Sequence, residues 1–256
     1  MARRDRSFPR RQLTADRRRY FSSNRWRLIA FGAVYLGLGV AVTITEFLLL
    51  GHGPLFWYAF GVFHAVWLAL LIGALVLMWL TSSPKAIHYL RGAFGEDNTT
   101  DVLKSARRTT IWGFVAGVET LGGDIDHLVV TRSGGVLAID SKWCNKATPE
   151  TLGKMAESAR SAARRAESVI RSENVGTLKR DSTARHRIPD LSYRVRPVVV
   201  VWGAERHRMP ESQAIAGVDF ISGQKLAQWL RSLEGQNVDR VAAKDLLTRL
   251  TDFKNR

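Results

Sequence analysis

Two long apolar segments stand out near the start of the chain, at residues 28–50 and 55–80. Each is long enough to cross a hydrocarbon core of about 30 Å as an α-helix, which takes about 20 predominantly apolar residues. The four residues between them, GHGP at 51–54, are typical of a tight turn. The pattern therefore predicts a transmembrane helical hairpin within residues 28–81.

An alternative interpretation, a cleaved signal peptide followed by a single anchor, agrees less well with the sequence. The apolar core of a signal peptide has about 7–15 residues, and the first apolar segment is longer. No small-residue cleavage site follows that segment. Glu46 and His64 are ionisable residues within the spans. We expect them at helix–helix contacts or close to the interface rather than along a transport pathway.

Basic residues predict how the spans are oriented. Residues 1–27 contain ten arginines and two aspartates, a net charge of +8, whereas residues 28–81 contain no Lys or Arg. Because basic flanks stay on the cytoplasmic side, we expect a multi-pass protein of the cell (plasma) membrane. Its N-terminus and its C-terminal domain should both be cytoplasmic. Residues 1–27 are too polar to form a core, so we expect a disordered tail that lies against anionic headgroups.

After the second span the pattern changes to short apolar runs and amphipathic stretches. Residues 124–131 and 136–143 are β-branched, apolar runs separated by RSGG, which is typical of a β-hairpin. Thr148 and either Asn237 or Asp239 are the expected helix caps. Helices are expected at 85–108, 149–173, 222–233 and 239–253, further strands at 110–118, 195–202 and 218–221, and a loop at 174–193. This order predicts an α/β fold in which helices flank a mixed sheet.

Charge and cysteine content narrow the possible functions. Residues 82–256 carry 28 basic and 20 acidic residues, a net charge of +8. Such a surface attracts phosphate polyanions and anionic lipids alike, and charge alone does not choose between them. Cys144 is the single cysteine, so the sequence excludes an intrachain disulfide and a cysteine-based metal site.

Two aspartates and a lysine are expected to meet at one end of the hairpin. A turn at the centre of RSGG pairs position 126 with a position near 141. Asp126 and Asp140 then lie at the same end of the two strands. Asp140 and Lys142 point to one face because side chains alternate along a strand.

These side chains suit metal-dependent chemistry on phosphates. Mg²⁺ (or Mn²⁺) binds carboxylate and carbonyl oxygens, so Asp126, Asp140 and the Ser141 carbonyl are candidate ligands. Lys142 would polarise a water molecule or stabilise charge on a phosphate. Glu96, on the preceding helix, would bind the metal through water or orient the nucleophile. In the simpler interpretation, Asp126 is a turn residue at a strand start and Lys142 a solvated strand end.

The segments around these residues resemble a known family. GE at 95–96, GDIDHL at 123–128 and GVLAIDSKW at 135–143 are similar to the nuclease-related domain, NERD. That family is similar to the PD-(D/E)xK nuclease superfamily. The resemblance covers roughly residues 90–205, including the PVVVV strand at 197–201.

The resemblance implies a fold, a set of site residues and a substrate. The fold is a restriction-endonuclease-like core at residues 85–205, with residues 206–256 as a strand and helix extension that packs on it. The implied site residues are Glu96 in the first core helix, Asp126 as the metal aspartate, and Asp140 with Lys142 as the D-x-K pair. The implied activity is Mg²⁺-dependent hydrolysis of phosphodiester bonds in DNA.

The chain departs from the family pattern in two places. Asp124 stands where the family usually has Glu, and residues 150–173 lack the Asn-Pro and Gln signature of the helix after the D-x-K strand. We therefore keep three hypotheses for the function. The first is a membrane-anchored nuclease acting on DNA. The second is a non-catalytic, membrane-tethered module that binds nucleic acid, and the third is a scaffold that lies on anionic lipid.

Overall fold

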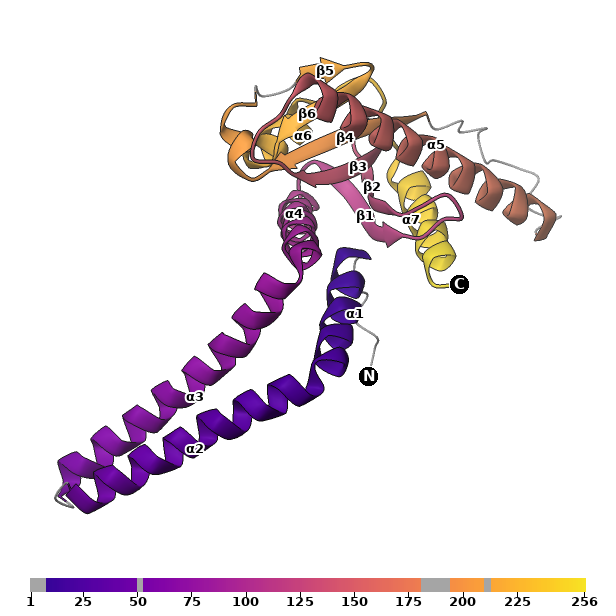
Figure 1. Ribbon diagram of the computed structural model, residues 1–256. Helices are drawn as coiled ribbons and strands as arrows, with labels where there is room; N and C mark the ends of the chain where they lie inside the picture. The colour runs from indigo at the N-terminus through magenta and orange to yellow at the C-terminus, as the bar shows by residue number, and fades with distance from the viewer. Residues whose placement is uncertain (1–7, 50–52, 181–193, 210–212) are drawn as a thin grey trace. The chain divides into compact units, whose positions relative to one another are not determined.

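The computed structural model describes residues 8–49, 53–180, 194–209 and 213–256 (Figure 1). The chain divides into two compact units. One unit is Arg11–Leu90 and holds the apolar segments, and the other contains Arg91–Arg256 and holds the β-sheet.

Two apolar helices form most of the first unit: α2 (Arg25–Leu49) and α3 (Pro54–Ser82). Within them, Arg25–Leu48 and Phe56–Ser82 are long and apolar enough to cross a membrane. The prediction of two candidate spans is therefore confirmed, with helix ends within three residues of the predicted ones.

Polar side chains connect α2 to α3. The Tyr35 hydroxyl donates a hydrogen bond to the Trp67 carbonyl (2.6 Å), and the two rings lie 4.5 Å apart between centroids. Thr43 Oγ1 lies 2.8 Å from His64 Nε2, and His64 Nδ1 lies 2.8 Å from the Phe60 carbonyl. His64 thus makes a contact between helices, as the sequence predicted. A hydrogen bond of this kind contributes about 0.6 kcal/mol in lipid.

The N-terminal segment differs from its prediction. Residues Phe8–Ser23 form helix α1, so the expected disordered tail is wrong for this stretch, while residues 1–7 lie outside the described residues. Arg, Gln, Leu and Ala are strong helix formers, which favours a helix despite the lack of an apolar core. Asp16 of α1 also accepts hydrogen bonds from Trp79 Nε1 (3.3 Å) and the Ser83 hydroxyl at the end of α3.

A six-stranded mixed sheet forms the centre of the second unit. Its strands are β1 (Ile111–Val118), β2 (Ile125–Thr131), β3 (Val136–Trp143), β4 (Val195–Trp202), β5 (Gln213–Ile215) and β6 (Val218–Ser222). They lie in the order β1-β2-β3-β4-β6-β5. Pairing is antiparallel from β1 to β3, parallel from β3 through β4 to β6, and antiparallel between β6 and β5. The predicted mixed α/β architecture is confirmed at this level.

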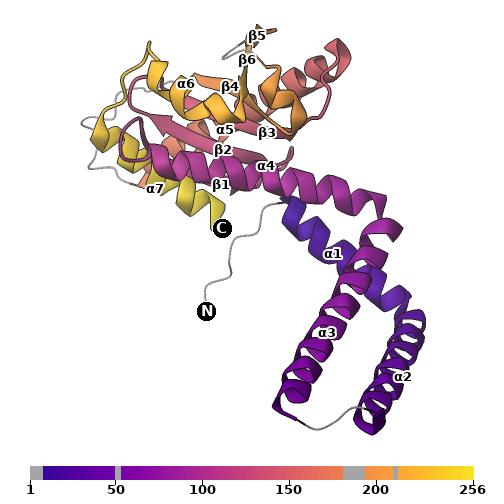
Figure 2. The ribbon, with the colours of Figure 1, turned by 90° about the vertical axis from the view of Figure 1, so that its left-hand side faces the viewer.

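Helices cover both faces of the sheet, as can be followed in Figure 2. They are α4 (Pro84–Ala106), α5 (Pro149–Arg180), α6 (Leu226–Ser232) and α7 (Arg240–Lys254), together with the short 3₁₀ helices η1 (Ala204–His207) and η2 (Gly223–Lys225). Leu137 and Ile139 of β3 pack with α4 and α6, whereas Val136 and Ala138 pack with α5 and α7. Alternate side chains of β3 therefore enter two separate cores.

Helices α5 and α7 begin at the predicted caps, whereas α5 ends later than predicted. The Thr148 hydroxyl accepts from Thr151 N at the start of α5 (3.2 Å), and Asp239 accepts from the first turn of α7. Helix α5 continues to Arg180 rather than ending at residue 173. The remainder of the predicted loop, residues 181–193, lies outside the described residues.

Candidate active site

The register of the β2–β3 hairpin differs by one residue from the predicted one. A turn centred on Ser133 and Gly134 would place position 126 opposite position 141, but His127 lies opposite Ile139. Continued by one residue, the observed register places Asp126 opposite Asp140.

This register matters because directly opposed residues of antiparallel strands share a face. Asp126 therefore lies on the same face as Asp140 and Lys142, whereas the predicted register would have placed it on the face of Ser141. The Gly135 N–H donates to the Gln236 carbonyl (3.0 Å) and Gly135 has φ +75°. The turn is thus shaped by a segment a hundred residues further along, which local sequence patterns do not reveal.

Backbone and side-chain contacts hold the two aspartates and the lysine together. Lys142 Nζ lies 2.7 Å from Asp140 Oδ1. Asp126 Oδ2 accepts a hydrogen bond from the backbone N–H of Ser141 (2.8 Å), which crosses from β2 to β3. Asp140 is 6% exposed, whereas the Lys142 side chain is 35% exposed. The lysine therefore joins a buried carboxylate to a surface that a ligand can reach.

The charges of the cluster act on one another. Burial raises the pKa of Asp126 well above its usual value, and the charges of Asp140 and Glu96 raise it further, against the opposing effects of Lys142 and the Ser141 N–H. Burial alone would lower the pKa of Lys142, but the charges of Asp140, Asp126 and Glu96 outweigh it and the pKa is raised. Asp126, Asp140 and Lys142 thus form one charged cluster on β2 and β3, and the charge of Glu96 on α4 acts on this cluster.

Ser158 is a member of the cluster that the sequence did not reveal. Its hydroxyl, on α5, donates to Asp140 Oδ2 (2.9 Å), while Lys142 binds Oδ1. Both oxygens of Asp140 are therefore engaged. The available signal was a serine on a helix face that is otherwise rich in alanine, and such a face is typical of close packing against a sheet.

Thr99 was also missed, although it connects three elements next to the site. Its hydroxyl donates to the Gly95 carbonyl (2.9 Å) and accepts from the Ser141 hydroxyl (2.9 Å) and from Trp202 Nε1 (2.9 Å). A threonine hydroxyl has one donor and two acceptor sites, so this group is fully used. It links the turn of α4 that carries Glu96 to β3 and β4.

His127, next to Asp126 on β2, is a packing residue. It is 1% exposed, and its Nε2 lies 2.8 Å from Thr100 Oγ1. Burial, and then the charge of Lys254, lower the pKa of His127 to about 3. The ring is therefore neutral at physiological pH and faces α4, on the side of the sheet opposite Asp126 and Asp140.

The donor set has the chemistry of a divalent cation site, but the side chains are not gathered around one point. Glu96, Asp126 and Asp140 offer hard oxygen ligands, and the positive charge of Lys142 lies beside them. Mg²⁺ and Mn²⁺ prefer such ligands. Within the described ranges, no group of three His, Cys, Asp or Glu side chains is arranged to hold a metal ion.

Comparisons with known proteins return no match: no protein-family model, no curated protein and no solved structure is similar to this chain. The structure itself defines the class as a mixed α/β domain joined to two helices that can span a membrane.

Proposed function

We propose that the protein is a membrane-anchored, metal-dependent nuclease of the NERD type that hydrolyses phosphodiester bonds in DNA. The observation that carries the proposal is the close placement of Asp126, Asp140 and Lys142 at one end of β2 and β3, with the charge of Glu96 acting on them from α4. These four residues are also those that the family resemblance implies. The mixed sheet is compatible with the restriction-endonuclease-like core that the resemblance requires.

Each residue has a role that its surroundings support. Asp126 and Asp140 would hold Mg²⁺ or Mn²⁺ with help from Glu96, and the bound ion would polarise the scissile phosphate and activate water. The raised pKa of Lys142 keeps its ammonium group charged at neutral pH. Lys142 therefore acts as an electrostatic stabiliser of phosphate charge and not as a proton acceptor.

The location of the activity follows from the apolar helices and from the charge of their flanks. α2 and α3 supply two candidate spans, and two crossings return the chain to the side from which it started. The arginines before α2 favour the cytoplasmic side. We accordingly place the sheet domain, and the DNA on which it acts, on the cytoplasmic face of the cell membrane.

A specific observation also favours the second hypothesis, a non-catalytic module that binds nucleic acid near the membrane. Both carboxylate oxygens of Asp140 already have protein partners, Lys142 and Ser158. In this alternative the ion pair is a permanent replacement for a metal ion, and the basic surface alone provides the function.

Cleavage assays on the full-length protein in uncharged detergent test the proposal. Supercoiled DNA, linear DNA and RNA are incubated with Mg²⁺, Mn²⁺ or EDTA. We expect metal-dependent cleavage of DNA that falls about 100-fold or more in Asp140→Asn and Lys142→Ala, because each variant removes a charge from the site.

A matched pair of controls comes from α4. Asp101 and Lys104 form an exposed ion pair (2.9 Å), so Asp101→Asn and Lys104→Ala remove the same charges away from the site. They should cleave at the wild-type rate. No cleavage by the wild type, with salt-dependent DNA binding retained, would replace the nuclease by the binding module. An absence of binding even at low salt would exclude both.

A further inference from the structure

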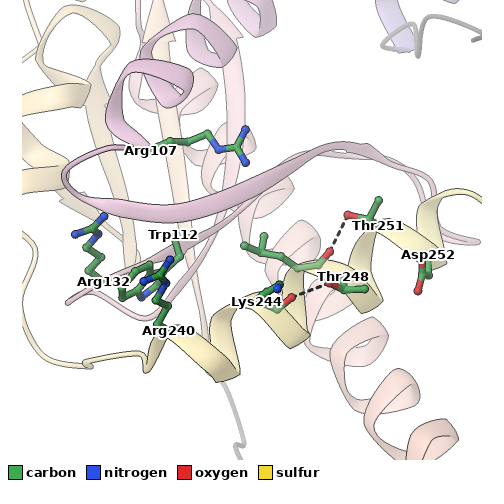
Figure 3. Close-up of a pocket in the computed structure, with 9 residues that line it drawn as sticks. Arg107, Trp112, Arg132, Arg240, Lys244, Thr248, Thr251 and Asp252 are labelled. Atoms are coloured by element: carbon green, nitrogen blue, oxygen red, sulfur yellow. Dashed lines mark hydrogen bonds between the residues drawn. The ribbon is translucent and has the colours of Figure 1, made fainter.

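A basic hollow lies at the end of the β1–β2 strand pair that is far from the carboxylates. It has a volume of about 750 Å³ and opens between α7 and the ends of the two strands (Figure 3). Its lining residues are Arg107, Trp112, Arg132, Arg240, Lys244, Leu247, Thr248, Thr251 and Asp252. Four cationic side chains thus face a space that contains one acidic side chain.

The cations come from three separate parts of the fold. Arg107 follows the last residue of α4, Arg132 follows the last residue of β2, and Arg240 and Lys244 lie one turn apart on α7. Arg107, Arg240 and Lys244 are exposed. Figure 3 shows Arg132 and Arg240 next to Trp112, with Lys244 following along the helix. Such convergence from distant segments creates a concentrated positive potential.

One of these cations is held in a fixed orientation. The Arg132 guanidinium carbon lies 4.5 Å from the centre of the Trp112 ring. Trp112 Nε1 donates to the Val238 carbonyl (2.8 Å), and Arg132 Nη2 donates to the Arg108 carbonyl (3.2 Å). A guanidinium group ordered in this way loses little further entropy when it binds a ligand. Its flat face also suits stacking with a nucleobase.

The N-terminus of α7 does not itself account for anion binding. Asp239 accepts hydrogen bonds from Val241 N (2.8 Å) and Ala242 N (3.2 Å), so the first amides of the helix already have a carboxylate partner. Anion binding in the hollow therefore depends on the side chains, which substitution can remove one at a time.

The distance between the hollow and the carboxylate cluster determines how long a ligand must be to contact both. Arg132 lies six residues from Asp126 along β2, which corresponds to about 20 Å. The hollow and the cluster are therefore separate places. A duplex in contact with both would extend over about six base pairs, at 3.4 Å for each.

We infer that the basic hollow binds the phosphate backbone of a nucleic acid and holds the strand about 20 Å from the proposed cleavage site. This inference rests on the proposed function for the identity of the ligand. The combination of four cations with an ordered guanidinium–indole stack favours a polynucleotide over a lipid headgroup, which needs only the charge.

Binding measured without cleavage separates this inference from the nuclease. Full-length protein in uncharged detergent and EDTA is titrated with fluorescent duplex and single-stranded DNA at several salt concentrations. Arg240→Ala with Lys244→Ala should weaken binding about tenfold or more at low salt. The slope of log affinity against log salt should fall by about two, because two phosphate contacts are lost.

Arg171→Ala with Arg231→Ala is the matched control, since it removes the same charge from exposed positions on α5 and α6. It should bind DNA almost as the wild type does, and thermal melts should show that both double variants fold. The hollow is not the DNA site if the Arg240/Lys244 variant binds DNA with the wild-type affinity and salt slope.

Binding of short-chain phosphatidylserine in the same detergent tests whether the hollow binds a lipid headgroup instead of a nucleic acid. Loss of binding to this lipid in the Arg240/Lys244 variant, with unchanged DNA affinity, would overturn the inference in favour of a lipid site. Loss of DNA binding in this variant, with the Arg171/Arg231 control unaffected, would support it whether or not the wild type cleaves DNA.

Discussion

The buried hydroxyl of Thr99 shows how much of the site depends on single polar atoms. It is the partner of Ser141, whose neighbours on β3 are Asp140 and Lys142, and of Trp202 on β4. Thr99 is 0% exposed, so water cannot replace it. Its contribution is to hold the helix of Glu96 at a constant distance from the D-x-K strand.

Thr99→Val should therefore destabilise the protein by about 1–3 kcal/mol, because it leaves buried donors of Ser141 and Trp202 without an acceptor. Thr99→Ser retains the hydroxyl and should lose less. Thermal unfolding of the full-length protein in detergent measures both. Equal melting temperatures for the two variants would show that the three hydrogen bonds do not contribute to stability.

The repulsion among the carboxylates leads to a second prediction at the residue scale. In EDTA at neutral pH, Asp126→Asn should raise the melting temperature, because a carboxyl whose pKa is raised by burial and by neighbouring charges costs folding stability above its usual pKa, whereas Asn has no such cost and keeps an oxygen that can accept from Ser141 N. Added Mg²⁺ should raise the melting temperature of the wild type through preferential binding to the folded state, and should have little effect on Asp126→Asn. A Mg²⁺ response that is the same in both proteins would contradict the assignment of Asp126 as a metal ligand.

Spacing in the sequence could bring three of the four candidate site residues to one strand end, whereas Glu96 was suggested by its helix and by the family resemblance. Asp140 and Lys142 are two residues apart on a strand, and the hairpin signal brings Asp126 to the same end. Thr99 and Ser158 could not be predicted in this way. A polar residue in a helix is ordinary in sequence, and only the packing of α4 and α5 against the sheet shows what it contacts.

At the scale of elements, some helix and strand ends follow from the local sequence, whereas others depend on contacts with distant segments. β4 begins and ends at the predicted residues because its apolar run is bounded by Arg194 and by Gly203, which has φ +84°. β5 was not predicted because three residues are too few to show a period. The one-residue difference in the hairpin arose because the turn is paired with the distant Gln236 segment.

The cap of α7 gives a pH-dependent prediction at this scale. Hydrogen bonds from the backbone of the first turn, that of Ala242 before that of Val241, lower the pKa of Asp239 below its usual 3.8. Between the folded and the unfolded pKa, the Asp239 carboxyl is therefore ionised in the folded state and protonated in the unfolded state. The stabilisation is present above pH 3.8 and is lost as the pH falls through the lower folded pKa.

Asp239→Asn keeps an oxygen at the cap and removes the titration. The wild type should therefore be more stable than Asp239→Asn above pH 3.8. The difference between their free energies of unfolding should become smaller below that pH. Asp239→Ala should be less stable than Asp239→Asn at every pH. Thermal melts between neutral and acidic pH provide the test, and a difference that does not change with pH would contradict the role of the charge.

For the whole molecule, the class of the fold was easier to predict than the arrangement of its strands. Apolar length identified the spans, and the order of strands and helices identified a mixed sheet. The position of β6 between β4 and β5 was not predicted, since pairing between distant strands leaves no local pattern in the sequence.

Membrane sidedness is the prediction that belongs to this scale. In a Cys144→Ala background, single cysteines are introduced at Ser22, Gly53 and Asp101, which are all exposed. A membrane-impermeant maleimide added to intact cells should label only the cysteine at position 53, because the arginines hold both flanks in the cytoplasm. After permeabilisation all three should react. Labelling at position 22 or 101 in intact cells would reverse the proposed orientation.

The parallel pairing of β3 with β4 has a consequence for the order of folding. Roughly fifty residues, including α5, separate these neighbouring strands along the chain, whereas short turns join β1, β2 and β3. Closing the longer loop costs more entropy before its contacts can form. We therefore expect the three-stranded meander to assemble first, with its charged cluster still open to water. Docking of the valine-rich β4 would then be the slow step that commits the chain to its native state.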